Sequence, residues 1–284
     1  MSDQAIDIEH LRGWVGRQQV AEQTIEPYPA RALAGLLDQP QAPVAGDPLP
    51  LPWHWLYFLD TPSRAGTGPD GHPKRGGFLP PVPLPRRMWA AGKLQITQPL
   101  VIGAAARRVS TVRSVELKEG KTGPLVFVTL DHELLQGDRL CLREEQNLVY
   151  REAPAAPAPL PPGEAAATTS AWSATVVPDP VLLFRFSALT YNGHRIHYDR
   201  DYATQQEFYP ALVVHGPLLA TLLLDLLQRE RPGAAISEFR FRAQRPAFDT
   251  DPVKLCGAID GAQVKLWTVD PQGMVGMSAT ATLA

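Results

Sequence analysis

The chain has 284 residues, of which 44% are hydrophobic and 20% are charged, and its formal net charge is −2. This is the composition of a globular protein with one large or two medium domains. A charge so close to zero gives no field that would hold a nucleic acid or a membrane surface, so we expect neither as a partner.

No apolar run approaches the roughly 18 residues of a membrane-spanning helix, and the first residues, MSDQAIDIEHLRGWVG, contain no apolar signal core. We therefore expect a soluble protein of the cytoplasm. The two cysteines, Cys141 and Cys256, show neither metal-ligand spacing nor a disulfide framework. We expect no metal site.

The first half predicts a short helix and several strand-like segments. ARALAGLL, residues 30–37, follows two prolines and is apolar, which is typical of a short helix. WHWLYFL, residues 53–59, is aromatic and predicts a strand. The loop at residues 61–85 is long and rich in Gly and Pro, and such loops often carry function. Residues 107–116 and 125–133 predict two strands that pair across a glycine-containing turn.

The clearest boundary is APAAPAPLPPGEAAATTS, residues 153–170. Proline removes backbone donors and favours extended backbone, so this segment is typical of a semi-rigid linker. It divides the chain into an N-terminal half, residues 1–152, and a C-terminal half, residues 171–284.

The second half predicts a buried helix followed by antiparallel strands. VVHGPLLATLLLDLL, residues 213–227, is apolar on nearly every face, and Gly216-Pro217 marks its start. Four strand-like runs with turn residues between the last three follow, at residues 236–244, 253–260, 262–270 and 274–283. This order supports an α+β fold. A helix wrapped by a curved antiparallel sheet is the hot-dog arrangement, which the pattern alone does not single out.

FSALTYNGHRIHYDRDYA, residues 186–203, is the densest polar cluster. It places Asn192, His194, His197 and Asp199 within eight positions, although the chain has only seven histidines. The cluster is either a catalytic centre or a polar loop that contains two histidines.

FSALTYNGHRIHYD and YPALVVHGPLLATLL resemble the MaoC-like (R)-specific enoyl-CoA hydratases, in particular the hydroxyacyl-thioester dehydratase type 2 branch. LREEQNLVYRE, HWLYFLD and GHPKRGGFLPPVPLPRRMWAAG extend the likeness over most of the chain, and are similar to the itaconyl-CoA and mesaconyl-C4-CoA hydratases of that branch. The resemblance implies a double hot dog with a degenerate, substrate- and CoA-binding N-terminal half and a catalytic C-terminal half.

The resemblance also implies the catalytic residues. The signature's Asp, and the His five positions after it, fall on Asn192 and His197, and its His-Gly at the helix start falls on His215-Gly216. In the family this Gly amide donates to the thioester carbonyl. An amide cannot act as a base, although it can hold a water. The type 2 branch carries Asn here too, which leaves His197 with both proton transfers.

The chemistry of hydration agrees with these roles. A base near neutral pKa must activate water, and an amide donor must stabilise the negative charge on the thioester oxygen. We therefore predict His197 as the acid–base residue, Asn192 as the residue that orients the water, and the Gly216 N–H as the oxyanion donor.

Several neighbours have two interpretations. Asp199 either orients a site group or caps a helix N-terminus. His194 is either a site residue or a partly exposed turn residue beside Gly193. His215 either binds substrate or has a structural role in which it hydrogen-bonds the backbone near the helix start.

Arginines are candidates for the free carboxylate of a dicarboxylic substrate, because the guanidinium group offers a planar fork of donors. The candidates are Arg86, Arg87 and Arg195, although a surface role explains each of them as well. We expect Trp89, beside two of these arginines, at the mouth of a pocket.

By resemblance the chain is a hydro-lyase that adds water to itaconyl-CoA or mesaconyl-C4-CoA and forms citramalyl-CoA, as in itaconate degradation. It needs no cofactor, since coenzyme A is part of the substrate, and it acts as a monomer or a homodimer. The alternatives are a 3-hydroxyacyl-ACP dehydratase of fatty acid synthesis, a non-catalytic acyl-thioester-binding protein, and a thioesterase that uses Asp199 or Glu207. The bulky side chains of Leu222, Leu223 and Leu224 favour a short acyl pocket.

Overall fold

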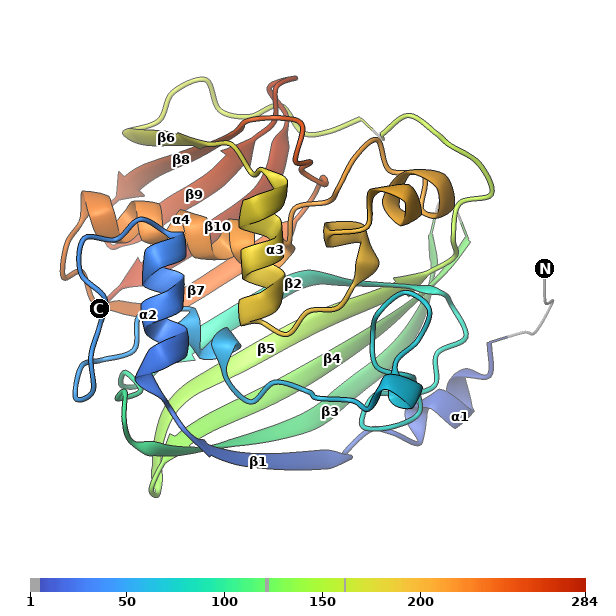
Figure 1. Cartoon of the computed structure of the whole chain (residues 1–284), viewed down its shortest axis with the longest axis horizontal. Coiled ribbons are helices and arrows are strands. Elements are labelled where there is room, and N and C mark those ends of the chain that lie inside the picture. Colours follow the sequence, from blue (N-terminus) through green and yellow to red (C-terminus); the bar gives the residue numbers. More distant parts are fainter. Residues whose placement is uncertain (1–5, 121–122, 161) are drawn as a thin grey trace.

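The computed structural model describes residues 6–120, 123–160 and 162–284. Ten antiparallel strands form one sheet in the order β1-β3-β4-β5-β2-β7-β10-β9-β8-β6 (Figure 1). They are β1 (Gln18–Thr24), β2 (Arg86–Ile96), β3 (Ala105–Gly120), β4 (Gly123–Gln136), β5 (Arg139–Arg151), β6 (Trp172–Val176), β7 (Ile236–Ala243), β8 (Val253–Asp260), β9 (Gln263–Val269) and β10 (Val275–Leu283). The first five strands in this order come from the N-terminal half and the other five from the C-terminal half.

The two halves join where β2 pairs with β7. Lys93 stands opposite Arg240, and Gly92 stands opposite Phe241. A Cβ atom on Gly92 would lie 2.5 Å from the Phe241 ring, so only glycine allows this close approach. Backbone hydrogen bonds therefore continue across the junction of the halves.

Four α-helices accompany the sheet: α1 (Ile8–Arg12), α2 (Pro27–Leu36), α3 (Pro180–Leu189) and α4 (Gly216–Glu230). α4 packs against β8, β9 and β10 (Figure 1), and all of its leucines are buried. The run of Leu and Ala favours a helix, and Pro217 suits its first turn. The predicted buried helix and its Gly216 start are confirmed.

The N-terminal half is covered differently. α2 confirms the predicted short helix, but it lies against α3. Leu79, Val82 and Leu84 from the long loop pack with strand residues such as Val128 instead. Irregular chain therefore covers part of the N-terminal sheet.

The predicted strand at residues 53–59 is wrong. Trp53–Leu56 forms a 3₁₀ helix, and Trp53, His54 and Leu56 are all buried. Aromatic content indicates burial, which a short helix satisfies as well as a strand. Pro50 and Pro52 lack the N–H donors that a strand ladder needs.

The other strand predictions are confirmed, with longer bounds for the β3–β4 hairpin. Residues 153–160 and 162–170 contain no helix, and their one β-bridge joins Ala165 to Met274. The division into residues 1–152 and 171–284 remains a prediction, because the sheet runs through both parts.

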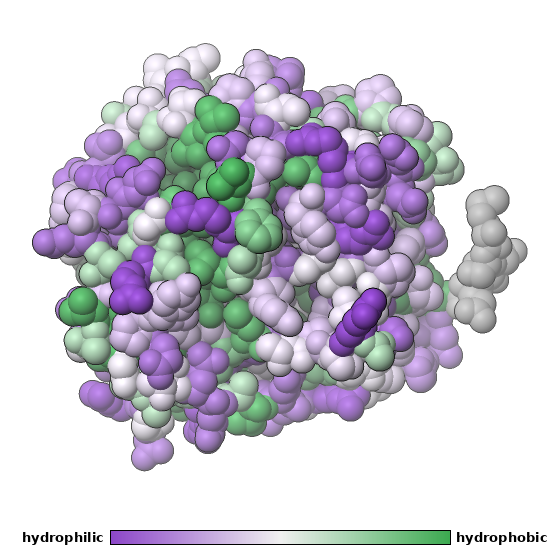
Figure 2. Space-filling model, in the orientation of Figure 1, coloured by the Kyte–Doolittle hydropathy of each residue, from purple (hydrophilic) through white to green (hydrophobic). Residues whose placement is uncertain are grey.

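Figure 2 shows one face of the molecule with hydrophobic residues scattered among hydrophilic ones. On α3, Val181 and Phe184 are exposed. None of the helices in the described ranges combines the length and the apolarity that crossing a membrane requires.

Candidate active site

His197 lies in a short 3₁₀ helix, Arg195–His197, that follows α3. Its side chain is buried, and its Nδ1–H donates to the Val213 carbonyl oxygen at 2.7 Å. A carbonyl only accepts, so Nδ1 carries the proton and Nε2 is an unprotonated base. Burial lowers the pKa of His197 to about 4, so the imidazole is neutral at physiological pH.

His215 and Gly216 stand directly beside His197. His215 is the N-cap residue of α4, and its ring stacks on the His197 ring with centroids 3.7 Å apart. Its Nε2 hydrogen-bonds the Ser187 hydroxyl at 2.8 Å. Gly216 is the first residue of α4, where backbone N–H groups have no intrahelical acceptor. The helix N-terminus thus presents amide donors next to the predicted base.

Asn192 is held by its neighbours in the chain. Its Oδ1 accepts from the His194 backbone N–H at 3.0 Å, and its own backbone N–H donates to the Ser187 carbonyl at 2.8 Å. The side-chain amide is thereby oriented, and the residue lines the same cavity as His197. It can therefore position a small polar molecule there.

One cavity of about 890 Å³ brings most of the predicted residues together. Asn192, His194, His197 and Gly216 line it from the C-terminal half, and Arg87 and Trp89 line it from the N-terminal half. The Trp89 ring packs edge-on against Trp55, with centroids 4.9 Å apart. The cavity therefore lies between the halves, with aromatic and polar walls.

The other predicted residues lie behind this wall. The Arg86 guanidinium pairs with the Glu207 carboxylate, and the Arg195 guanidinium pairs with Asp199 at 2.7 Å. Oδ1 of Asp199 accepts from the Tyr202 N–H at 3.0 Å, which is the capping alternative stated above. These contacts support the walls of the cavity.

Two residues of the long loop reach the site, although the sequence did not predict them. His72 lines the cavity, and Asp70 hydrogen-bonds it at 2.9 Å. The Asp70 carbonyl accepts from the Arg195 N–H at 2.9 Å. Gly71, between them, has φ +91°, and a Cβ atom there would lie 1.7 Å from the Gly193 carbonyl oxygen. The Asp-Gly-His run in a glycine-rich loop was the available signal.

A row of buried polar residues that lines the cavity was also not predicted from the sequence. Ser110, His132 and Glu144 stand opposite one another on β3, β4 and β5. His132 hydrogen-bonds Ser110 at 2.7 Å, and Nε2 of His54 lies 3.1 Å from the Glu144 carboxylate. All four side chains are buried. Polar residues at inward positions of otherwise apolar strands were the signal.

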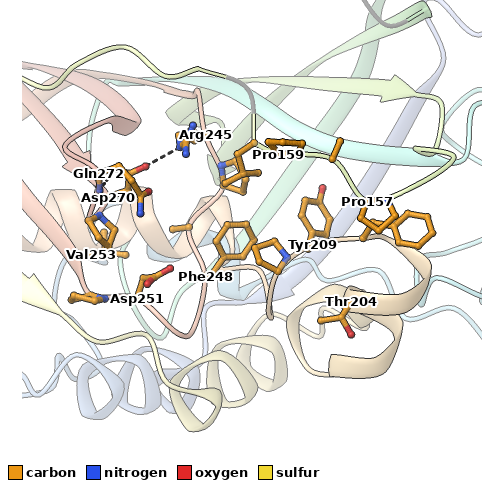
Figure 3. A pocket seen from close by; sticks show the side chains of 18 residues that line it. Pro157, Pro159, Thr204, Tyr209, Arg245, Phe248, Asp251, Val253, Asp270 and Gln272 are labelled. Carbon is orange, nitrogen blue, oxygen red and sulfur yellow. Dashed lines mark hydrogen bonds and ion pairs between the residues drawn. The ribbon is translucent and has the colours of Figure 1, made fainter.

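A second hollow, of about 630 Å³, adjoins the cavity. Figure 3 shows Pro157 and Pro159 of the linker segment on one side of it, with Tyr209 and Phe248 nearby. An ion pair of 2.8 Å between Arg245 and Asp270 lies at another side. Tyr209 and Arg245 line both hollows, so the two hollows are neighbours.

The buried histidines predict acid-sensitive stability. Burial lowers the pKa values of His72, His194, His197 and His215. Between the ordinary pKa near 6.5 and the lowered ones, the unfolded chain binds more protons, so stability is fully present above pH 6.5 and is lost as pH falls. His197 alone contributes on the order of 3 kcal/mol across pH 6.5 to 4. Urea unfolding at pH 7.5 and pH 5 should show the lower midpoint at pH 5, and equal midpoints would contradict these shifts.

Comparisons with known proteins show the family of the chain. The hydroxyacyl-thioester dehydratase type 2 family matches residues 52–249. The chain is 48% identical over 272 residues to the mesaconyl-C4-CoA hydratase of Chloroflexus aurantiacus, covering 95% of this chain and 96% of the relative. It is 27% identical over 229 residues to the mitochondrial hydroxyacyl-thioester dehydratase type 2 of Schizosaccharomyces pombe, covering 72% and 76%.

Solved structures confirm the fold. A MaoC-like dehydratase superposes with a TM-score of 0.70 at 13% identity, covering 96% of this chain and 99% of that one. HtdX of Mycobacterium tuberculosis superposes with a TM-score of 0.67 at 17% identity, covering 93% and 98%. The predicted α+β double hot dog is therefore confirmed. The chain belongs to the hydroxyacyl-thioester dehydratase type 2 family and is a hydro-lyase.

Proposed function

We propose that the chain hydrates a short, branched dicarboxylic enoyl-CoA, mesaconyl-C4-CoA or itaconyl-CoA, to citramalyl-CoA. The observation that carries this proposal is the state of His197. Its Nδ1–H is fixed on the Val213 carbonyl, so its unprotonated Nε2 is available in the cavity beside the N-terminus of α4. A neutral imidazole next to amide donors is suited to water addition on an enoyl thioester.

In this mechanism Nε2 of His197 takes a proton from water as the water oxygen bonds to the β-carbon. Asn192 orients that water with its side-chain amide. The displaced electron pair moves to the thioester oxygen, where the Gly216 N–H and the α4 dipole stabilise it. A proton then reaches the α-carbon and completes the addition.

The free carboxylate of mesaconyl-C4-CoA is bonded to the β-carbon, the carbon that water attacks. A cation that recognises it must therefore stand close to the catalytic histidine. Arg87 is the best candidate, because it lines the cavity and its charge, after burial, helps to lower the pKa values of His72 and His194. The guanidinium groups of Arg86 and Arg195 are already paired with carboxylates.

Itaconyl-CoA has its double bond one carbon further from the thioester. It needs a proton shift before water addition, and a neutral imidazole at the site can carry that proton. The same cavity is thus compatible with both substrates.

A hydroxyacyl-ACP dehydratase is the second candidate, favoured by the likeness to the mitochondrial yeast relative. Such an enzyme needs an apolar tunnel, whereas the buried polar side chains of His132 and Glu144 line this cavity. Initial rates on mesaconyl-C4-CoA, itaconyl-CoA, crotonyl-CoA and a long-chain 3-hydroxyacyl-ACP separate the two. We expect the highest kcat/KM with a dicarboxylic thioester, and a preference for crotonyl-CoA or the long chain would refute the proposal.

Substitution of Arg87 tests how the substrate is recognised. A hydrogen bond to a charged group contributes about 1.5–3 kcal/mol, so Arg87→Ala should lower kcat/KM for mesaconyl-C4-CoA by about 10- to 150-fold. Crotonyl-CoA has no carboxylate, and its kcat/KM should change little. Arg107→Ala, at an exposed position of β3, is the matched control. Equal losses on both thioesters would assign Arg87 to another role.

A further inference from the structure

A carboxylate–imidazole pair from the N-terminal half lies beside the predicted catalytic residues. Nδ1 of His72 lies 2.9 Å from Oδ2 of Asp70, and the His72 backbone N–H donates to Oδ1 at 3.1 Å. An ionised carboxylate only accepts, so Nδ1 carries the proton and Nε2 is left for proton exchange. His72 lines the cavity, which gives it access to a bound ligand. A base oriented by a carboxylate is a recurring catalytic arrangement.

The pair is fixed close to His197. The His72 and His194 ring centroids are 4.0 Å apart, and those of His194 and His197 are 5.4 Å apart. The Asp70 carbonyl accepts from the Arg195 N–H, which binds the loop to the catalytic segment itself. Two imidazoles from different halves of the chain therefore border the same space.

His72 and His197 differ in the groups that would stabilise the protonated imidazole. Burial and the nearby charges of Arg87 and Arg75 lower the pKa of His72, but a proton on its Nε2 forms an ion pair with Asp70 that opposes this shift. A proton on His197 creates a buried cation whose ring contacts are a backbone carbonyl and two other imidazoles. Charge burial without a counter-charge is costly. His72 is therefore the better of the two at holding a proton, and His197 is the better base.

We propose that His72, oriented by Asp70, is a second acid–base residue of this site and exchanges the proton at the substrate α-carbon while His197 activates water. The inference rests on the hydration chemistry proposed above. As the C–O bond forms at the β-carbon, His197 takes the water proton. The His72 imidazolium then gives its Nε2 proton to the α-carbon of the enolate. Transfer of the proton from His197 back to His72, through water or His194, restores both residues, so no external acid or base is consumed.

Metal binding is the competing explanation for this cluster. Asp70, His72 and His194 bring ligand atoms within 4.8 Å of one another. Two imidazoles bound to one tetrahedral zinc at about 2.1 Å would have ring centroids about 5 Å apart. Here the centroids are 4.0 Å apart with 39° between the planes. This centroid distance is shorter than the zinc geometry gives, which favours acid–base chemistry.

The test compares His72→Gln, Asp70→Asn and the matched control Lys74→Gln, an exposed position two residues along the loop. The assays use crotonyl-CoA, which does not depend on the dicarboxylic assignment, and mesaconyl-C4-CoA. We expect His72→Gln to lower kcat by about 10²- to 10⁴-fold with a small change in KM. It should also abolish exchange of the product α-hydrogen with D2O, followed by NMR.

Asp70→Asn should lower kcat less and move the alkaline limb of the pH–rate profile to lower pH, because the imidazolium loses its counter-charge. Lys74→Gln should match the wild type. Thermal unfolding shows whether each variant is folded. If His72→Gln does not fold, the pH–rate profile of Asp70→Asn tests the acid–base role of His72.

A kcat of His72→Gln within about fivefold of the wild type, or an unchanged Asp70→Asn profile, would overturn the inference and leave the proposed function intact. Loss of activity on EDTA treatment, with recovery on adding zinc, would overturn it in favour of a metal site. A wild-type protein that is inactive on both thioesters would refute the proposed function itself, and the inference with it.

Discussion

His197→Asn should lower the kcat for hydration by about 10²- to 10⁴-fold, the usual contribution of a general acid–base residue. Asparagine keeps an N–H that can donate to the Val213 carbonyl in place of Nδ1–H, so the local anchor is preserved. What disappears is the unprotonated Nε2. We therefore expect KM to change little while kcat collapses, measured by steady-state kinetics on mesaconyl-C4-CoA and crotonyl-CoA.

His10→Asn is the control for this substitution, because His10 is exposed on α1, away from the cavity. It should leave kcat unchanged. Near-wild-type activity of a folded His197→Asn variant would remove His197 from the mechanism.

Gly71→Ala should lower both activity and stability, although glycine has no side chain that could take part in the chemistry. Its φ of +91° is strained for alanine, and the new Cβ would lie 1.7 Å from the Gly193 carbonyl oxygen. The backbone of the loop must shift, and it would carry His72 away from the catalytic segment. A displacement of about 1 Å in a catalytic group can cost 10²-fold in rate. We expect a kcat loss of at least that order and a lower midpoint of thermal unfolding.

Gly76→Ala is the control that separates backbone strain at a positive φ from the steric clash of a new Cβ atom. Gly76 has nearly the same φ, +90°, but its Cβ would meet only Pro81 at an ordinary 3.6 Å. It should cost some stability and little activity. If both variants lose kcat equally, backbone strain explains the effect and the contact between Gly71 and Gly193 does not matter for catalysis.

The sequence predicts a structural feature or a site residue when the residues that determine it lie close together in the chain. The α4 helix and its Gly216 start follow from Pro and Leu placement along a short stretch. Asn192 and His197 lie five positions apart, so one motif contains both. His72 lies more than a hundred residues before His197, and only the folding of the loop over the junction unites them.

The roles of Arg86 and Arg87 also depend on contacts that are distant in the sequence. Arg86 and Arg87 are adjacent in β2, and alternation along a strand turns them to opposite sides. The sequence could not say which side faces the cavity. The pairing of Arg86 with Glu207, 121 positions away, depends on tertiary structure alone.

The junction of β2 with β7 bears on how many acyl-CoA molecules each chain binds. The loop at residues 61–85 of the N-terminal half contributes His72 to the cavity that the Asn192–His197 motif of the C-terminal half lines. The reciprocal arrangement would need a second Asn-to-His motif in residues 1–152, and the sequence has none there. Because the shared backbone ladder fixes the halves in one register, each chain should bind one equivalent of acyl-CoA, where two identical half-size chains in the same arrangement would offer two sites.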